Sequence, residues 1–336
     1  MSGVPTLRDL PPPPPGRTGW PWTEGPPPAP PALPDGSAWP RITLVTPSFE
    51  QGGFIEETIR SVLLQGYPAL EYLVFDGGST DGTTEILRRY EPWLAGWTSG
   101  PDRGQTHAIA KGLDAATGEL FNWINSDDHL APGALEEVGR VWARERFHLL
   151  AGRGLTLDAA DRGPVHDWRP RAPRRPTDFL RPHAVVLAQP ATFLCTATLR
   201  EIGGVREDLH YVMDWELYLR ATLRLRGRLR TAETPALLAV ALQHPAAKTT
   251  ARPAAFGDEA RRVVRESRPL WRRGEWVRMA SRLRRMEAQA AVGEALEGAA
   301  HPLAAIARLP LRWPDVLLSR FWWGGLRRAL ARPARP

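Results

Sequence analysis

A regular alternation of short apolar runs and amphipathic segments begins at Arg41 and constrains the fold more than any other feature of this sequence. "RITLVTPSF" is a β-branched apolar run typical of a buried strand, and "FIEETIRSVLLQ" carries the apolar stripe of a helix. "EYLVFDGGS" and "GTTEILRRY" repeat that order, and a strand near "LAGWTS" precedes the helical "QTHAIAKGLDAAT" and the strand in "FNWINSDD". The alternation predicts an α/β fold of right-handed βαβ units, with a mainly parallel central sheet flanked by helices.

Composition divides the chain into three parts. Residues 1–40 are rich in proline and glycine and are expected to form a disordered arm, because such a segment buries too little apolar surface to order itself. Residues 41–255 hold the alternating strands and helices. Residues 256–336 are predicted to form a basic, helical C-terminal extension, with ten arginines from Arg261 to Arg285.

The charge of the chain favours an acidic partner. Its 336 residues carry a formal net charge of +7, and nucleic acid, anionic lipid and phosphorylated substrates all qualify as partners. The single cysteine, Cys195, excludes an internal disulfide. No signal peptide and no run of about 18 apolar residues is recognisable, so a cytoplasmic protein without a membrane span is expected.

Polar residues gather where the predicted strands end. In an open parallel sheet, ligands bind in the crevice at the carboxyl ends of the strands, so these side chains are expected at one rim. They are Ser48, Glu50, Asp76, Asp102, Arg103, Asp127 and Asp128. Each alone is typical of a turn or a helix cap, and the adjacent aspartates fit either a solvated turn or a divalent-cation site. Their joint pattern favours a binding site.

Several ordered motifs resemble those of a known family. "ITLVTPSFEQGGFIEETIRSVLLQGYP", "EYLVFDGGSTDGT", "PDRGQTHAIAKG" and "GELFNWINSDDHLAPGAL" are similar to the family 2 glycosyltransferases of the GT-A fold, in particular the branch found in bacterial exopolysaccharide and colanic-acid-type gene clusters. The resemblance implies a Rossmann-like GT-A domain. It also implies inverting transfer of a sugar from a nucleoside-diphosphate-sugar to a hydroxyl of a glycan acceptor, which is usually lipid-linked in such pathways.

The resemblance also implies which residues bind the nucleotide-sugar donor. Asp76 is expected to contact the nucleobase, with Ser48 and Glu50 beside the nucleotide, although Glu50 stands where many relatives carry Asn. The implied donor-binding set is completed by Asp102, Arg103, Lys111, Asp127 and Lys248. Lys111 and Lys248 are the only lysines of the chain, and lysine is a compact point charge suited to phosphate.

The resemblance also implies a divalent cation, Mg²⁺ or Mn²⁺, at "NSDD". Asp128 is expected as the direct ligand, Asp127 near the ribose or the metal, and His244 as a residue that helps to hold the metal or the diphosphate. Such an ion would stabilise the leaving diphosphate as a Lewis acid. Asn125 stands where relatives often carry Asp, which leaves the ligand count open.

Asp214 in "HYVMDWELYLR" resembles the family's catalytic carboxylate, which takes the proton from the acceptor hydroxyl. Aspartate is also favoured as a helix N-cap, so a purely structural role stays open. Glu216 is the second candidate.

Two other classes of function compete with this interpretation. A nucleic-acid-binding protein would fit the charge, but the sequence has no RNP, KH or zinc-finger pattern, so no nucleic acid is expected as partner. A nucleotidyltransferase would carry a basic phosphate loop after the first strand, and "PSFEQGGF" contains no basic residue.

The C-terminal segment sets Trp313, Phe321, Trp322 and Trp323 among arginines. It could pack on the domain, mediate self-association, or lie on an anionic membrane surface as an amphipathic anchor. The membrane interpretation is favoured, which places the protein peripherally on the inner face of the plasma membrane.

Overall fold

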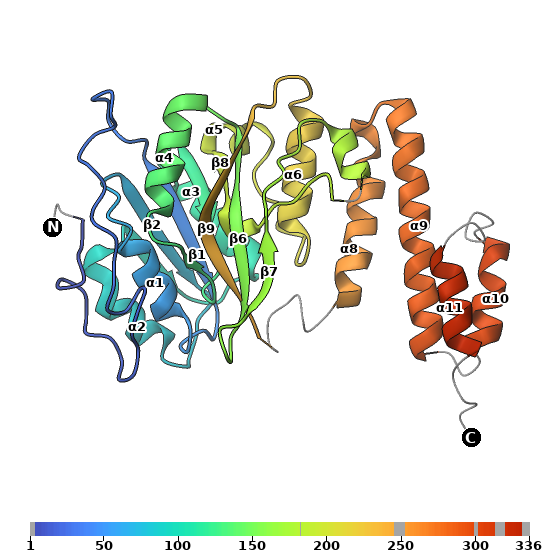
Figure 1. Ribbon diagram of the computed structural model, residues 1–336, viewed down its shortest axis with the longest axis horizontal. Coiled ribbons are helices and arrows are strands. Elements are labelled where there is room, and N and C mark those ends of the chain that lie inside the picture. The colour runs from blue at the N-terminus through green and yellow to red at the C-terminus, as the bar shows by residue number, and fades with distance from the viewer. Residues whose placement is uncertain (1–3, 182, 245–252, 299–301, 313–319, 331–336) are drawn as a thin grey trace. The chain divides into compact units, whose positions relative to one another are not determined.

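The computed structural model describes residues 4–181, 183–244, 253–298, 302–312 and 320–330 (Figure 1). The chain divides into two units, Met1–Thr250 and Ala251–Pro336. Lys248 lies outside the described residues, so its expected phosphate contact stays a prediction.

The first unit is built on a nine-stranded sheet whose first four strands run parallel, as the alternation predicts. A helix follows each of the first three strands and returns the chain to the same edge of the sheet, so all four strands end at one rim. These elements are β1 Ile42–Ser48, α1 Ile55–Leu63, β2 Leu70–Asp76, α2 Thr83–Tyr90, β3 Gly96–Ser99, α3 Gln105–Ala115 and β4 Leu120–Trp123.

The second half of the sheet is mixed, which the expectation of a mainly parallel sheet did not include. Strand β8 pairs antiparallel with β4 and β6, β7 with β6, and β5 with β9, whereas β6 and β9 are parallel. The β6–β7 hairpin needs only a short turn and no crossover helix. The elements of this half are β5 His129–Leu130, α4 Ala134–Glu145, β6 Leu149–Asp158, β7 Pro164–Trp168, β8 Thr192–Cys195, α5 Thr196–Glu201, α6 Met213–Arg224 and β9 Thr231–Gln243.

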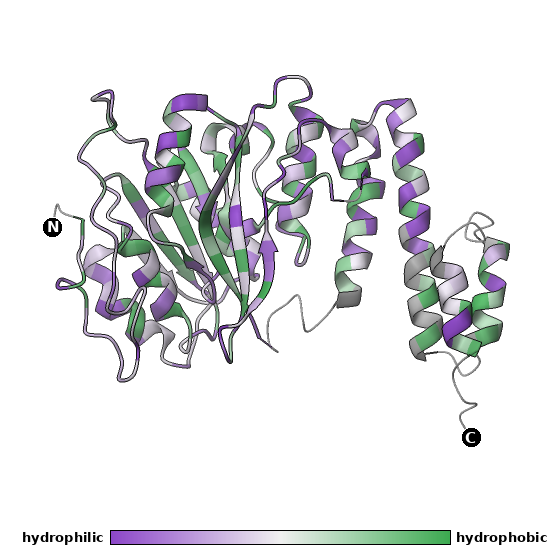
Figure 2. Cartoon of the chain, viewed as in Figure 1, coloured by the Kyte–Doolittle hydropathy of each residue, from purple (hydrophilic) through white to green (hydrophobic). Residues whose placement is uncertain are grey.

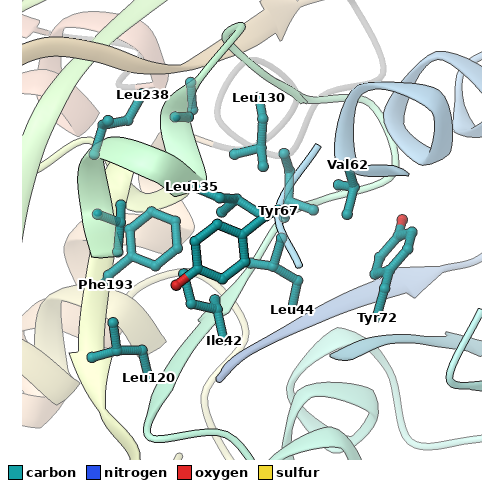
Figure 3. Close-up of a cluster of buried hydrophobic side chains, with 14 of the residues drawn as sticks. Ile42, Leu44, Val62, Tyr67, Tyr72, Leu120, Leu130, Leu135, Phe193 and Leu238 are labelled. Atoms are coloured by element: carbon teal, nitrogen blue, oxygen red, sulfur yellow. The ribbon is translucent and has the colours of Figure 1, made fainter. Parts of the chain in front are cut away.

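The strand order β3-β2-β1-β4-β8-β6-β9-β5 places β1 and β4 near the middle of the sheet. Ile42 and Leu44 of β1 are buried with Val62 of α1 and Phe193 of β8 in one apolar core (Figure 3). In Figure 2 the central strands are largely hydrophobic, while hydrophilic residues alternate with hydrophobic ones along the helices that cover them. The core therefore fixes the strands whose ends carry the predicted site.

Residues 4–40 differ from the disordered arm that the sequence predicts. Their backbone is irregular, but Leu10, Trp22, Leu33 and Trp39 are buried. Trp20 Nε1 also donates a hydrogen bond to the backbone oxygen of Leu130 at 2.8 Å. The composition argument failed because these isolated apolar side chains supply the burial that the prolines and glycines do not.

Arg60 of α1 holds this arm. Its side chain is fully buried and its guanidinium donates to the backbone oxygens of Pro11 at 2.7 Å, Pro21 at 3.1 Å and Trp22 at 3.0 Å, and to the Tyr90 hydroxyl at 3.0 Å. Proline-rich backbone has few internal hydrogen bonds, so its carbonyl groups need other donors. A guanidinium, with five N–H groups in a rigid fork, supplies several at once.

The second unit is helical. Its helices are α8 Pro253–Glu266, α9 Arg273–Gly298, α10 Pro302–Arg312 and α11 Arg320–Leu330. Val292 of α9 and Ile306 of α10 share a small core with Trp322, whose Nε1 donates to the Ile306 oxygen at 2.9 Å. Trp323 is half exposed, and neither Trp313 nor the Phe321 side chain belongs to the described part. Within the described residues, no helix is both long and apolar enough to cross a membrane.

Candidate active site

Asp76 ends β2 beside Ser48, the last residue of β1, because the two strands pair in parallel register. Its buried carboxylate accepts hydrogen bonds from the backbone N–H of Gly78 at 3.1 Å and of Ser79 at 2.9 Å, and from the hydroxyls of Ser79 and Ser99. Because Ser99 ends β3, three neighbouring strand ends meet at this carboxylate. Asp76 is therefore held rigidly at the rim.

Glu50 braces the loop after β1. It has a φ of +53°, its backbone N–H donates to Ser79 Oγ at 2.7 Å, and its Oε1 accepts from the Thr80 N–H at 2.9 Å. The carboxylate thus links the β1–α1 loop to the β2–α2 loop. Ser48 Oγ is buried and has no hydrogen-bond partner in the part of the chain that the structure describes, so it can serve a ligand.

Asp102 and Arg103 lie in the loop between β3 and α3. Asp102 Oδ1 accepts from the Gly104 N–H at 2.7 Å, which makes it a turn-stabilising residue here. Arg103 forms an ion pair with Glu207, and both side chains are exposed. Lys111 lies further along α3 and is half-buried.

The adjacent aspartates lie between β4 and β5, and the end of β9 comes beside them. Asp128 is buried; its Oδ1 accepts from the Leu242 N–H at 3.2 Å and its Oδ2 from Asn125 Nδ2 at 3.0 Å. His244 Nε2 lies 3.0 Å from Asp127 Oδ2. The structure thus brings His244, which is more than a hundred residues distant in sequence, next to the aspartate pair.

Electrostatics favour a cation at this pair. Burial, and then the charge of Asp127, raise the pKa of the Asp128 carboxyl well above its usual range. The hydrogen bond with Asp127 raises the pKa of the His244 imidazole. No group of three or more His, Cys, Asp or Glu among the described residues is arranged to hold an ion alone. Mg²⁺ is often bound by one or two carboxylates plus substrate phosphates, so the residues fit an ion shared with a substrate.

Gln105 and Asn125 form a relay to Asp128 that the sequence reasoning missed. Gln105 Nε2, at the start of α3, donates to Asn125 Oδ1 at 2.6 Å, and Asn125 Nδ2 donates to Asp128 Oδ2. Gln105 was visible in the "PDRGQ" motif, but only the fold reveals that it reaches the aspartate loop. Asn125 therefore orients the Asp128 carboxylate, and Gln105 in turn holds Asn125.

Asp214 and Glu216 lie in the first turn of α6 with different surroundings. Asp214 Oδ1 accepts from the Trp215 N–H at 2.7 Å, and burial raises the pKa of the Asp214 carboxyl. Glu216 faces Arg220 through both oxygens, at 2.8 and 3.0 Å, and Arg220 also donates to two backbone carbonyls. Glu216 therefore forms a buried ion pair with Arg220, whereas Asp214 has no cation partner among the described residues.

The segment before α6 is tied to the start of α3. Thr106 Oγ1 donates to the Leu209 oxygen at 2.6 Å, next to the ion pair between Arg103 and Glu207. Within the described ranges, no hydrogen bond or ion pair joins Asp214 directly to the carboxylates of β2 or of the β4–β5 loop. The connection between these groups runs through α3.

A parallel half-sheet with carboxylates at one rim is the arrangement of a GT-A-type fold, and solved structures share this fold. The S. aureus protein TarS, solved with UDP-GlcNAc, superposes with a TM-score of 0.59 at 16% identity, covering 86% of this chain and 90% of that structure. The mannosyltransferase PcManGT of Pyrobaculum calidifontis, solved with GDP-Man and Mn²⁺, gives a TM-score of 0.53 at 19% identity, covering 87% and 84%. At these identities the likeness shows the fold alone.

Sequence relatives identify the family. The model for glycosyl transferase family 2 matches residues 43–200. The uncharacterized glycosyltransferase Rv1514c of Mycobacterium tuberculosis is 31% identical over 191 residues, which span 55% of this chain and 70% of that protein. TuaG of Bacillus subtilis, named for teichuronic acid biosynthesis, is 32% identical over 134 residues, 38% of this chain and 51% of TuaG. The chain belongs to glycosyl transferase family 2.

A further relative carries an acceptor in its name. The GalNAc(5)-diNAcBac-PP-undecaprenol beta-1,3-glucosyltransferase of Campylobacter jejuni is 29% identical over 107 residues, 30% of this chain and 33% of that enzyme. The family and the GT-A-type fold that the motifs predict are therefore confirmed.

Proposed function

We propose that the chain is a metal-dependent, inverting glycosyltransferase that moves a sugar from a nucleoside-diphosphate-sugar to a hydroxyl of a lipid-linked glycan in cell-envelope polysaccharide biosynthesis. The observation that carries this proposal is that the carboxylates occur in two different places and environments. Asp76, Asp127 and Asp128 lie at or just after strand ends, whereas Asp214 is a half-buried carboxylate on α6 without a cation partner among the described residues. Donor binding and acceptor activation require two such separate groups. The names of TuaG and of the Campylobacter enzyme support the pathway and the lipid-linked acceptor.

The nucleoside lies at the ends of β1 and β2 in this proposal. Among the described residues, Asp76 Oδ1 accepts a hydrogen bond from the Ser79 hydroxyl alone, so it keeps capacity for an N–H of the nucleobase. Ser48 Oγ, which is buried beside it, contacts the nucleotide, and Glu50 keeps the surrounding loops in place. The diphosphate lies toward the N-terminus of α3, near Asp102 and Arg103, where the helix dipole favours an anion.

Asp214 acts as the general base. It takes the proton of the acceptor hydroxyl while the hydroxyl oxygen attacks the anomeric carbon and the bond to the diphosphate breaks. Direct displacement of this kind inverts the anomeric centre. The raised pKa of the Asp214 carboxyl brings this group closer to neutral pH and makes it a stronger base than an ordinary aspartate.

A divalent cation, when bound, stabilises the charge that develops on the leaving diphosphate. Asp128 and Asp127 hold it, His244 orients Asp127 through their hydrogen bond, and the Gln105–Asn125 relay orients Asp128. Lys111 of α3 adds positive charge toward the phosphates in this proposal, and the phosphate contact expected of Lys248 stays a prediction.

A thermal-shift screen tests this function. UDP, GDP, CDP and ADP are each added with Mg²⁺ or Mn²⁺, and we expect one nucleotide to raise the Tm of the wild-type chain. Substitution Asp128→Ala should remove most of that shift, because the cation loses its principal protein ligand. The exposed Asp114 of α3 offers a matched control, and Asp114→Ala should leave the shift unchanged. A metal-independent shift, or an equal loss in both variants, would refute the assigned site.

We also propose that the second unit contacts an anionic membrane surface on the cytoplasmic side. Leu311 of α10 and Trp323 and Leu330 of α11 are exposed, and Arg327 and Arg328 are exposed on the same helix as Trp323. Exposed apolar side chains next to arginines are typical of interfacial helices. A lipid-linked acceptor would be delivered at such a surface.

A further inference from the structure

A few buried polar atoms have no hydrogen-bond partner in the described part of the chain. They include Ser48 Oγ, Gln189 Oε1 and Tyr218 Oη. A buried polar atom left without a partner destabilises the fold, and native proteins keep few of them. Ser48 lies in the expected nucleotide site, whereas Gln189 has no role in the proposed function described above.

The amide of Gln189 has a fixed orientation. Gln189 lies in the short helix η3, Gln189–Ala191, and its Nε2 donates to the Trp123 backbone oxygen at 2.8 Å and to Asn122 Oδ1 at 3.3 Å. Asn122 Nδ2 in turn donates to the Pro190 oxygen at 2.9 Å. Because both neighbours of Nε2 are acceptors, the nitrogen must face them. Oε1 is therefore the atom that lacks a partner.

Gln189 lies on the far side of β4 from the nucleotide residues. Trp123 is the last residue of β4, and the loop to Asp128 follows it. The sheet order β2-β1-β4-β8 puts Asp76 and Ser48 on one side of β4, and η3, which leads directly into β8, on the other. A donor with its nucleoside at β1 and β2 and its diphosphate where the N-terminus of α3 meets the β4 loop would extend its sugar toward Gln189.

The acceptor side of the proposed reaction lies near the same segment. Thr192, the first residue of β8, donates its hydroxyl to the Ala188 oxygen at 2.7 Å, so it holds the start of η3. Tyr218, one helical turn after Asp214, is buried, and burial, together with the charge of Asp214, raises the pKa of its hydroxyl well above the usual range. Gln189 thus lies between the metal-binding loop and the segment packed near the general base.

We propose that Gln189 binds the transferred sugar, with Oε1 accepting a hydrogen bond from one of its hydroxyl groups. The assignment rests on the proposed function and names a specificity residue within that site. An amide oxygen can only accept, so its partner must carry a proton: a sugar hydroxyl qualifies, and an ionised diphosphate does not. The rigid anchoring of Nε2 by β4 makes Oε1 selective for the position of that hydroxyl.

Isothermal titration of the full chain with Mn²⁺ tests this proposal. The probes are UDP, GDP, UDP-glucose, UDP-GlcNAc and GDP-mannose. We expect Gln189→Ala to weaken binding of the preferred nucleotide-sugar roughly three- to tenfold, as loss of one hydrogen bond predicts, while binding of the matching nucleoside diphosphate is unchanged. Equal weakening of both ligands overturns the proposal.

Gln65 provides a matched control. It is also a buried glutamine whose Nε2 donates to two backbone oxygens, of Ser61 at 2.8 Å and Ala131 at 3.0 Å, but its Oε1 accepts from the Leu135 N–H. Gln65→Ala should lower the Tm without a selective loss of nucleotide-sugar binding. A selective loss in this variant as well would show that the effect at Gln189 is merely structural, and would overturn the proposal.

Deoxy analogues of the preferred donor test the same contact on the wild-type chain, independently of how any variant folds. Removal of one particular hydroxyl should weaken wild-type binding by the same factor, and should have no further effect in Gln189→Ala. A wild-type chain that binds nucleoside diphosphate but gains no affinity from any sugar overturns the role of Gln189 alone. A chain that binds neither kind of ligand overturns the proposed function itself.

Discussion

Asp214 and Glu216 are two residues apart in the first turn of α6, yet their surroundings give them different chemistry. Arg220 neutralises Glu216 inside the protein, and the pair makes a buried, bidentate contact. Asp214 is half-buried and has no such partner among the described residues, and desolvation raises the pKa of its carboxyl. The contrast separates a residue available for proton transfer from a residue that stabilises the fold.

Substitution of the two carboxylates should therefore give opposite results. Asp214→Asn should lower kcat by about a hundredfold or more, because general-base catalysis is lost, while the free energy of unfolding changes little. Glu216→Gln should lower the free energy of unfolding by about 3–5 kcal/mol, because Arg220 would keep a buried charge without its counter-ion. Urea titrations and initial transfer rates measure the two quantities. A stable but inactive Glu216→Gln protein would reverse the assignment.

The carboxylates of the site could be predicted from sequence because they follow strand signals, but their partners could not. Asp76 comes directly after a recognisable apolar run, and Asp127 and Asp128 follow another run within four residues of its last apolar residue, Ile124. The Gln105–Asn125 relay and the anchoring of Gln189 by Trp123 depend on how separate elements approach one another. Side-chain identity alone carries no information on such approaches.

At the scale of elements, local pattern predicts the parallel half of the sheet and fails beyond it. The amphipathic stripe of α1 and the apolar runs of β1 and β2 are sufficient to indicate βαβ units. Strand β8 pairs antiparallel with β4 although α4, β6 and β7 lie between the two in the chain, so nothing in the local spacing specifies its partner. Pairing there is decided by tertiary packing.

Helix α1 also holds residues 4–40 in place, through the hydrogen bonds of Arg60. Arg60→Ala should lower the free energy of unfolding by about 3–5 kcal/mol, because it removes a fully buried side chain and leaves carbonyl groups without donors. Hydrogen exchange of residues 10–25 should rise more than exchange of the sheet. Both effects are measured by urea titration and exchange mass spectrometry.

Arg88 is a suitable control for that experiment. It is exposed and forms an ion pair with the exposed Glu85 at 3.4 Å. Arg88→Ala should cost no more than about 1 kcal/mol, as is usual for exposed pairs, and should leave exchange of the arm unchanged. Equal effects of the two substitutions would show that the arm does not depend on Arg60.

At the scale of the whole molecule, the proposed membrane contact belongs to the second unit alone. Trp322 is buried in its own helical core, so the exposed Trp323 and Leu311 are the side chains available to lipid. The double variant Trp323→Ser, Leu311→Ser should reduce co-sedimentation with vesicles of any composition. Arg327→Ala should reduce it about fivefold, and only with anionic vesicles, since each arginine near such a surface contributes about 1 kcal/mol.

Vesicle binding that is insensitive to both changes would locate the contact elsewhere, and equal binding to neutral and anionic vesicles would exclude a role for the arginines. Circular dichroism of each variant provides the control for folding. Trp322→Ser is the informative counterpart, because it should reduce helicity of the unit as well as sedimentation.

The dependence of the arm on Arg60 has a consequence for biosynthesis. Residues 4–40 are synthesised before Arg60, whose guanidinium binds them, and before Tyr90, whose hydroxyl accepts a hydrogen bond from that guanidinium. The arm therefore gains its docking surface only after α1 and α2 have been made.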